Sequence, residues 1–237
     1  MTMTVKPEYY GFSVEDLGLS KACIEYAMGF SPGDTPSPFD EIIDRTLLEA
    51  EEHSSIKGAV IEIPKILPDH SQGIILFDHT KLHTGTRITT LLEDAESMIC
   101  FIITAGKGIE KWMQQCMQQQ DTYSSYVIDV VGSEMVDLAG LQLQNLVERQ
   151  KAKAGLAITD MYSPGYCNWP VSDQETIFSF FPEGCCGITL TESLLMDPIK
   201  SISGIMGVGK KVVRNRENYC SHCNQTECIY RHRRHQH

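Results

Sequence analysis

The first regular pattern of apolar and polar positions follows a loop rich in Pro and Gly at residues 31–38. From there apolar side chains recur every three or four residues, as on one face of an α-helix. They are Phe39, Ile42, Ile43, Leu47 and Ala50. Because Ser37 and Pro38 suit the N-cap and the first helical position, we predict a helix over residues 38–50. Residues 1–20 lack such a period, so no element is predicted there.

Three apolar runs downstream have the length and composition of β-strands. Residues 56–63 alternate between apolar and polar positions, which is typical of a strand buried on one face. Residues 73–77 form the second run, and residues 98–104 are apolar throughout, which indicates a strand buried on both faces. A short helix is predicted between these two, over residues 86–94.

Two helices are predicted next, over residues 108–119 and 122–152, and Gly155 suits the left-handed residue that ends the second. The second helix carries a broad apolar stripe made of Tyr126, Val127, Val130, Met135, Leu138 and Leu146. Ser172 and Glu175 then form a capping box for a helix that ends at Phe180. Residues 188–192 and 201–208 are predicted to be strands paired with each other.

Strands and helices in this order, without strict βαβ alternation, predict an α+β fold with a mixed or antiparallel sheet and flanking helices. The sequence has no internal repeat. We predict one domain over residues 1–210 and a Cys- and His-rich basic tail over residues 211–237.

The formal net charge of −11 is unevenly distributed. From Lys210 onward, seven Lys and Arg stand against two Glu, so the body is acidic and the tail is basic. Because phosphate binding depends on a basic surface, this argues against nucleic acid as a partner. The longest apolar stretch, residues 98–105, is too short to span a bilayer. The nine Cys are scattered rather than paired in a framework, so we expect a cytoplasmic protein with free or metal-bound thiols.

The segment YSPGYCNWP at residues 162–170 is the most informative local motif. Pro164 fixes its own φ and Gly165 tolerates a positive φ, so we predict a tight bend whose backbone groups are available to a ligand. Tyr166 and Trp169 are expected to line this bend with aromatic surface.

This bend is followed by LTES at 190–193, MDP at 196–198 and SISG at 201–204. The ordered set resembles the reactivation domain of cobalamin-dependent methionine synthase, closest over residues 156–209. That family's pattern is an Arg, three residues, Gly-Tyr and a Pro four residues later, then Leu-Thr-Glu-Ser, Met-x-Pro and Ser-x-Ser-Gly. The chain is similar to a short, stand-alone form of the domain.

The resemblance implies an accessory protein that binds S-adenosylmethionine and caps cobalamin on a separate methyltransferase or corrinoid protein. In the family, an oxidised cobalamin is remethylated after one-electron reduction, so an external electron donor is implied as well. The contribution of such a protein is to position the reactants, and no catalytic side chain is required.

The resemblance also implies ligand contacts at Gly165, Tyr166 and Asn168. Glu134 or Asp137 on the long helix is implied to meet the ligand's amino group, and a solvated helix face is the alternative for both.

A second implied surface comprises residues 190–193 and 201–204. Within it, Glu192 and Ser203 are the implied contact residues. It is implied to face the corrin, because small residues let a flat macrocycle approach the backbone. Two ordinary strands of a sheet are the alternative.

One position departs from the family. Its Arg falls at Met161, which cannot replace the charge-assisted, bidentate contact of an Arg with a carboxylate. Either another cation takes this role, with Arg149, Lys151 and Lys153 nearest in sequence, or the ligand is not bound. The protein would then be a non-catalytic module that binds a corrinoid protein and uses its tail for a metal or for electron transfer.

The tail carries Cys220, Cys223 and Cys228. A Cys-x-x-Cys puts two thiolates on one turn, a third Cys can close toward them, and His232 or His222 would complete a tetrahedral zinc site. Three thiolates also suit an iron–sulfur cluster. A metal-free thiol cluster is the remaining interpretation.

Overall fold

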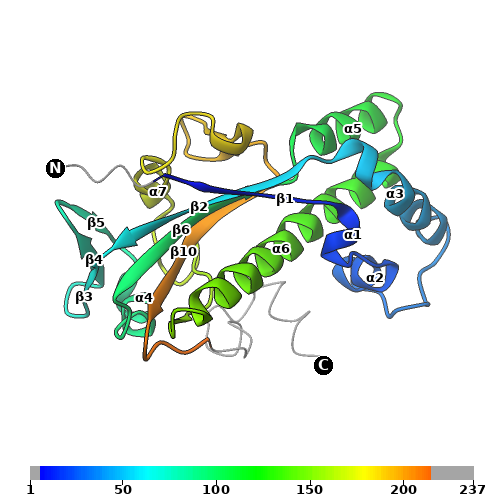
Figure 1. Ribbon diagram of the computed structural model, residues 1–237. Helices are drawn as coiled ribbons and strands as arrows, with labels where there is room; N and C mark the ends of the chain where they lie inside the picture. Colours follow the sequence, from blue (N-terminus) through cyan, green and yellow to red (C-terminus); the bar gives the residue numbers. More distant parts are fainter. Residues whose placement is uncertain (1–5, 215–237) are drawn as a thin grey trace.

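The computed structural model describes residues 6–214, and one sheet runs through the middle of the molecule (Figure 1). Its strands lie in the order β1, β2, β6, β10, β7, and every neighbouring pair is antiparallel. The bounds are β1 (Glu8–Phe12), β2 (Ile56–Pro64), β6 (Ser97–Thr104), β10 (Ser201–Gly209) and β7 (Ala157–Ile158). The predicted α+β class, with an antiparallel sheet, is confirmed.

Helices cover one face of this sheet (Figure 1). The long helix α6 (Thr122–Ala152) is packed against α3 (Phe39–His53), α5 (Lys107–Gln118), α2 (Lys21–Met28) and α1 (Val14–Leu17). Ile99, Phe101 and Ile103 of β6 belong to this core, whereas Cys100 and Ile102 belong to a second core on the other face. Because side chains alternate along a strand, β6 is buried on both faces, as predicted.

Smaller elements enclose the second core. They are the sheet of β3 (Leu67–Asp69), β4 (Ile74–Phe77) and β5 (Thr80–Leu82), with α4 (Gly85–Leu91), η1 (Val171–Asp173), α7 (Gln174–Phe178) and η2 (Cys185–Gly187). A hairpin of β8 (Thr189–Leu190) and β9 (Met196–Asp197) follows η2. Tyr162 and Trp169, from the segment that follows β7, are buried in this second core.

Three features differ from the prediction. Residues 8–28 contain β1, α1 and α2, elements of four to eight residues that are too short to show a period. Pro38 itself occupies the N-cap of α3, without a side-chain cap bond, so Ser37 does not cap the helix. In α6, Tyr126 and Leu146 are exposed. The buried face of the helix does not coincide with the predicted apolar stripe and leaves these two side chains at its margins.

Candidate functional site

The bend at residues 163–169 is closed by its own backbone. The N–H of Gly165 donates to the carbonyl of Trp169 at 2.8 Å, and the N–H of Trp169 donates to the carbonyl of Tyr166 at 2.9 Å. Gly165 has a φ of 95°, and Cys167 and Asn168 are also left-handed, at 52° and 65°. The predicted tight bend is therefore present, but the Gly165 N–H already has an acceptor within it.

The two aromatic residues of the bend lie in opposite environments. Tyr166 is 66% exposed, whereas Trp169 is 1% exposed. Asn168 is exposed beside them. The expectation that both rings line a ligand surface is wrong for Trp169, because its ring is buried in the second core and anchors the bend.

A buried carboxylate holds Trp169 in place. The indole Nε1 donates to Oδ2 of Asp173 at 2.8 Å, and the backbone N–H of His83 donates to the same oxygen at 2.5 Å. Asp173 precedes α7 but makes no side-chain cap bond, since its carboxylate is occupied by these donors. The predicted capping box of Ser172 and Glu175 is therefore wrong: a 3-10 turn precedes the helix, which begins at Gln174 and ends at Phe178.

The chain enters the bend along the edge of the main sheet. The N–H of Thr159 donates to the carbonyl of Gly207 on β10, and the N–H of Gly207 donates to the hydroxyl of Thr159. Tyr162 then forms an antiparallel bridge with Ile205. Gln144 of α6 donates to the carbonyl of Thr159 at 3.1 Å. A Cβ on Gly140 would lie 3.2 Å from Cε of Met161, so Met161 lies against α6 where that helix has no side chain. The position of the family's Arg is thus at the interface of α6 and the sheet edge.

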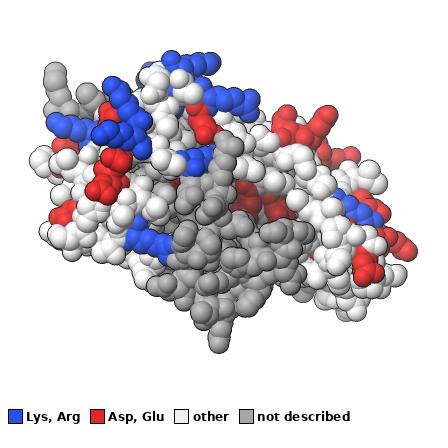
Figure 2. Space-filling model, turned by 90° about the horizontal axis from the view of Figure 1, so that it is seen from below, with Lys and Arg blue, Asp and Glu red and all other residues white. Residues whose placement is uncertain are grey.

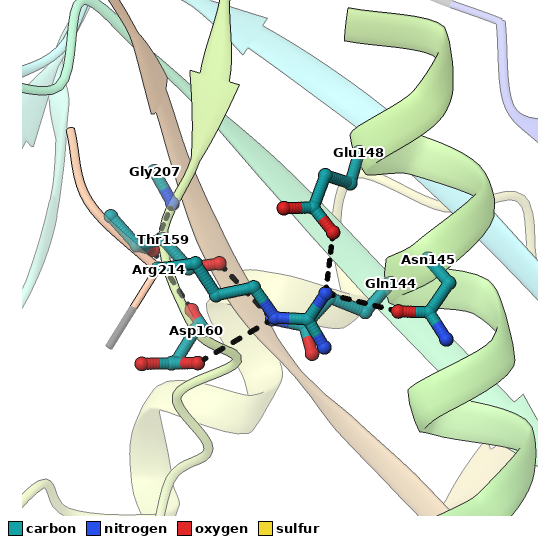
Figure 3. Close-up of polar contacts among 7 residues, drawn as sticks. All are labelled: Gln144, Asn145, Glu148, Thr159, Asp160, Gly207 and Arg214. Atoms are coloured by element: carbon teal, nitrogen blue, oxygen red, sulfur yellow. Dashed lines mark hydrogen bonds and ion pairs between the residues drawn. The ribbon is translucent and has the colours of Figure 1, made fainter. Parts of the chain in front are cut away.

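Arg214 brings a cation to this edge (Figure 3). Its Nη1 donates to Oε2 of Glu148 at 2.6 Å and to Oδ1 of Asn145 at 3.0 Å, and its Nε lies 3.9 Å from Oδ1 of Asp160. The side chain is only 12% exposed. Sequence reasoning missed this residue, because it is far from Met161 along the chain; the only signal was its place in the basic stretch after the last predicted strand.

The cations chosen from the sequence are less well placed. Nζ of Lys151 contacts Oε2 of Glu62 at 2.5 Å, on β2. Arg149 is exposed and its Nε donates to the carbonyl of Asn145, while Lys153 is exposed beyond the end of α6. Arg214 therefore replaces these three as the candidate cation.

The implied carboxylates lie on α6 near Met161. Asp137 is exposed and Glu134 is half-buried, about one and two helical turns before Gly140. Their role toward a ligand stays a prediction. Neither of two hollows in the described surface is lined by Asp160, Met161 or Arg214. One, of about 230 Å³, is lined by Arg45 and Trp112, and the other, of about 160 Å³, by Glu62 and Lys151.

The second implied surface is built differently from the prediction. β8 pairs with β9, whereas β10 lies between β6 and β7, so residues 190–193 and 201–204 are not paired strands. Glu192 is exposed in the β8–β9 turn, but Ser203 is 2% exposed. A Cβ on Gly204 would lie 2.2 Å from the carbonyl oxygen of Tyr162. The small residues of β10 therefore accommodate the protein's own chain.

The predicted metal ligands Cys220, Cys223, Cys228 and His232 lie outside the described residues. Within residues 6–214, no group of three or more His, Cys, Asp or Glu is arranged to hold a metal ion. Over the same range, no helix has the length and apolar character needed to cross a membrane.

Comparison with known proteins gives two findings. A family model described as the vitamin B12 dependent methionine synthase activation domain matches residues 87–215. The fold is similar to the crystal structure of the MetH reactivation domain bound to AdoHcy, with a TM-score of 0.64 and 15% sequence identity over 91% of this chain and 81% of that chain. At this identity the likeness shows the fold alone. No curated protein matches the sequence.

Proposed function

Because this chain belongs to the family of vitamin B12 dependent methionine synthase activation domains, we propose that it binds S-adenosylmethionine and caps cobalamin on a separate methyltransferase. The similar reactivation domain was crystallised with AdoHcy, which is what S-adenosylmethionine becomes when it gives up its methyl group. That complex supports the choice of ligand.

The observation that carries the proposal is a pair of opposite charges, Arg214 and Asp160, at the sheet edge that leads into the Gly165–Tyr166 bend. The amino-acid part of S-adenosylmethionine has an ammonium and a carboxylate, which need partners of opposite sign. Asp160 would meet the ammonium, and Arg214 would take the role of the Arg that is absent at Met161. The exposed ring of Tyr166 would cover the adenosine part.

Positioning would suffice for the chemistry. The sulfonium group already activates the methyl group, so the protein has to hold the donor in line with the cobalt of the partner. We place the partner at the β8–β9 hairpin and the turn after it, where Leu195 and Ile199 are 60% and 56% exposed. Apolar side chains at the surface suit the flat corrin face. An external electron donor would supply the reduction that precedes methyl transfer.

The capping claim is tested by mixing the protein with a cobalamin-loaded methyltransferase domain and recording the visible spectrum of the corrin. We expect a saturable change that is larger for the cob(II) state, because a cap shifts an equilibrium only if it binds one state better. Leu195→Asp should abolish the change, whereas Leu48→Asp, at an exposed position on α3, should not. An unchanged spectrum at saturating protein would refute capping.

One observation favours a second function. Met161 lacks the charge of the family's Arg, and Arg214 already contacts Glu148. If these contacts leave no cation for the ligand, the protein is a non-catalytic module that binds a corrinoid protein without S-adenosylmethionine.

We also propose a metal on the tail, held by Cys220, Cys223, Cys228 and His232. Elemental analysis of protein purified without oxygen distinguishes the alternatives. About one zinc in colourless protein would indicate a structural site, and iron with sulfide and visible absorption would indicate a cluster and a route for electrons. Neither metal in fully reduced protein would refute the proposal.

A further inference from the structure

The hollow of about 230 Å³ opens where α3, α5 and the start of α6 meet. None of the residues that line it in the described structure belongs to the sheet edge. Sites for drug-sized ligands usually measure about 300–1,000 Å³, so this hollow suits a smaller molecule. Its wall includes Arg45, Thr46 and Glu49 on α3, Trp112 and Cys116 on α5, and Asp121 at the N-cap of α6.

Trp112 gives the hollow an apolar floor. Its side chain is 8% exposed and stacks on His53, with ring centroids 4.2 Å apart and planes at 17°. Cys116 follows one helical turn later on α5, on the same face of the helix. Burial raises the pKa of the Cys116 thiol, so the thiol is neutral at pH 7. The indole ring and the neutral thiol together offer contact to an apolar, polarisable group.

Arg45 is the cation of the hollow, and it is held in position. Its Nη2 donates to Oγ of Ser124 at 2.7 Å and lies 4.0 Å from Oδ2 of Asp121. Hydrogen bonds from the side chain and the backbone N–H of Ser124 hold the pKa of Asp121 below its ordinary value, so Asp121 stays ionised beside the guanidinium. Arg45 is still 56% exposed, and since a guanidinium has five N–H donors, several remain for a ligand.

Two more polar groups of α3 face the hollow without a hydrogen bond to residues 6–214. The carboxylate of Glu49 forms no ion pair or hydrogen bond in this range, although its charge raises the pKa of the nearby Cys116 thiol. The hydroxyl of Thr46 forms none either, although the residue is only 1% exposed. Because buried hydroxyls are normally hydrogen-bonded, Thr46 indicates a polar occupant of the hollow.

The surrounding charges indicate which kind of ligand fits. Residues 13–53 contain ten Asp and Glu, with Lys21 and Arg45 as the only Lys and Arg. Figure 2 shows acidic side chains gathered at the right-hand end of the lower face, the end at which α3 lies in Figure 1. These carboxylates repel a simple anion, and Arg45 repels a simple cation. A zwitterion avoids both costs, since each of its charges meets a partner of opposite sign.

We propose that this hollow binds a small free α-amino acid with an apolar side chain. The carboxylate of the ligand would contact Arg45 and Thr46, and its ammonium would contact Glu49. Its side chain would lie over Trp112 and Cys116. Because a thioether makes favourable contacts with an aromatic ring, L-methionine is a suitable probe. The site is independent of the proposed function, because it shares no residue with the sheet edge.

Titration of the purified full chain with L-methionine tests the site, with calorimetry and tryptophan fluorescence as readouts. We expect saturable binding with a Kd of about 1 mM or tighter, because the ligand has a charge-assisted contact at each end. The chain has two Trp, and Trp169 is buried in the second core. Trp112→Phe should therefore abolish the fluorescence change and keep the heat of binding. No saturable heat up to about 10 mM L-methionine would overturn the proposal.

The charge contacts are tested by matched variants. Glu49→Gln removes no hydrogen bond or ion pair within residues 6–214 and should weaken binding by about tenfold, whereas Glu52→Gln, at an exposed position on the same helix, should not. Equal affinities for these two variants would overturn the role of Glu49 and with it the proposal.

Two further comparisons locate the carboxylate of the ligand. Arg45→Gln should weaken binding by about tenfold, and Arg214→Gln should leave it unchanged. The reverse result would place the amino acid at the sheet edge and overturn the proposal. The amine that remains when the carboxylate is removed from methionine should bind at least about tenfold more weakly than methionine. Equal binding of this amine would contradict recognition of a zwitterion.

Discussion

The guanidinium of Arg214 donates to the carboxylate of Glu148 across 2.6 Å, and this contact ties the chain that follows β10 to α6. Both residues lie at the sheet edge that leads into the Gly165–Tyr166 bend. Since the Arg214 side chain is only 12% exposed, removing one partner would leave a largely desolvated charge. This pair therefore fixes the candidate ligand edge and the start of the tail together.

The first prediction concerns Asp173. Asp173→Asn should lower the free energy of unfolding by about 2 kcal/mol, because the carboxylate accepts from both Trp169 and His83 and hydrogen bonds to a charged group are strong. Urea unfolding measures the change. Glu183→Gln, an exposed acidic side chain in the same part of the fold, should change it by less than about 0.5 kcal/mol. Equal unfolding curves for the two variants would contradict the anchor role of Asp173.

A second prediction separates the two explanations for the small residues of β10. A Cβ on Gly204 would lie 2.2 Å from the carbonyl oxygen of Tyr162, so Gly204→Ala should destabilise the protein by about 1–3 kcal/mol without any partner present. Gly11→Ala, on β1 with nothing within 4 Å, is the matched control and should be neutral. If Gly204→Ala is as stable as wild type, the close approach of Tyr162 is not what requires Gly there.

A third prediction concerns acid stability. Burial alone would raise the pKa of Glu62, but hydrogen bonds from Lys151 and Ser97 outweigh it and hold that pKa below its ordinary value. A lowered pKa in the folded state stabilises the protein above the unfolded value of about 4.3, and this contribution is lost as the pH falls through the folded value. Urea midpoints measured from pH 7 to pH 3 should therefore fall less steeply for Glu62→Gln. Parallel curves would argue against this linkage.

Much of the fold follows from local sequence pattern. The bounds of α6, β2 and β6 agree closely with the predicted ranges, because long periodic or apolar segments carry enough positions to define them. The short elements β1, α1 and α2 do not, since four to eight residues cannot show a period. The partners of the strands could not be predicted from local pattern either. β8 pairs with its neighbour β9, whereas β10 pairs with β6, which lies about a hundred residues earlier in the chain.

The candidate site was predictable only where sequence neighbours form it. The bend follows from Pro164 and Gly165, but the burial of Trp169 depends on Asp173 and on His83, which lies in another part of the chain. Arg214 approaches Asp160 only because β10 and the segment after β7 are neighbours in the folded sheet. No pattern around Met161 indicates that cation.

A fourth prediction tests the departure at Met161. Met161→Arg should tighten S-adenosylmethionine binding by about tenfold, since a charge-assisted contact contributes about 1.5–3 kcal/mol. Met117→Arg adds the same charge at an exposed position on α5 and should leave the affinity unchanged. Equal tightening by both variants would indicate a general effect of charge and would contradict a specific role for residue 161.

The central claim, that this chain binds S-adenosylmethionine, is tested most directly by calorimetric titration of the purified full chain with that ligand. We expect saturable heat with one ligand per chain. The affinity should fall by about tenfold or more in Arg214→Gln and stay unchanged in Arg149→Gln, whose exposed side chain lies on the same helix as Glu148. The absence of binding heat in both the wild type and Met161→Arg would contradict it.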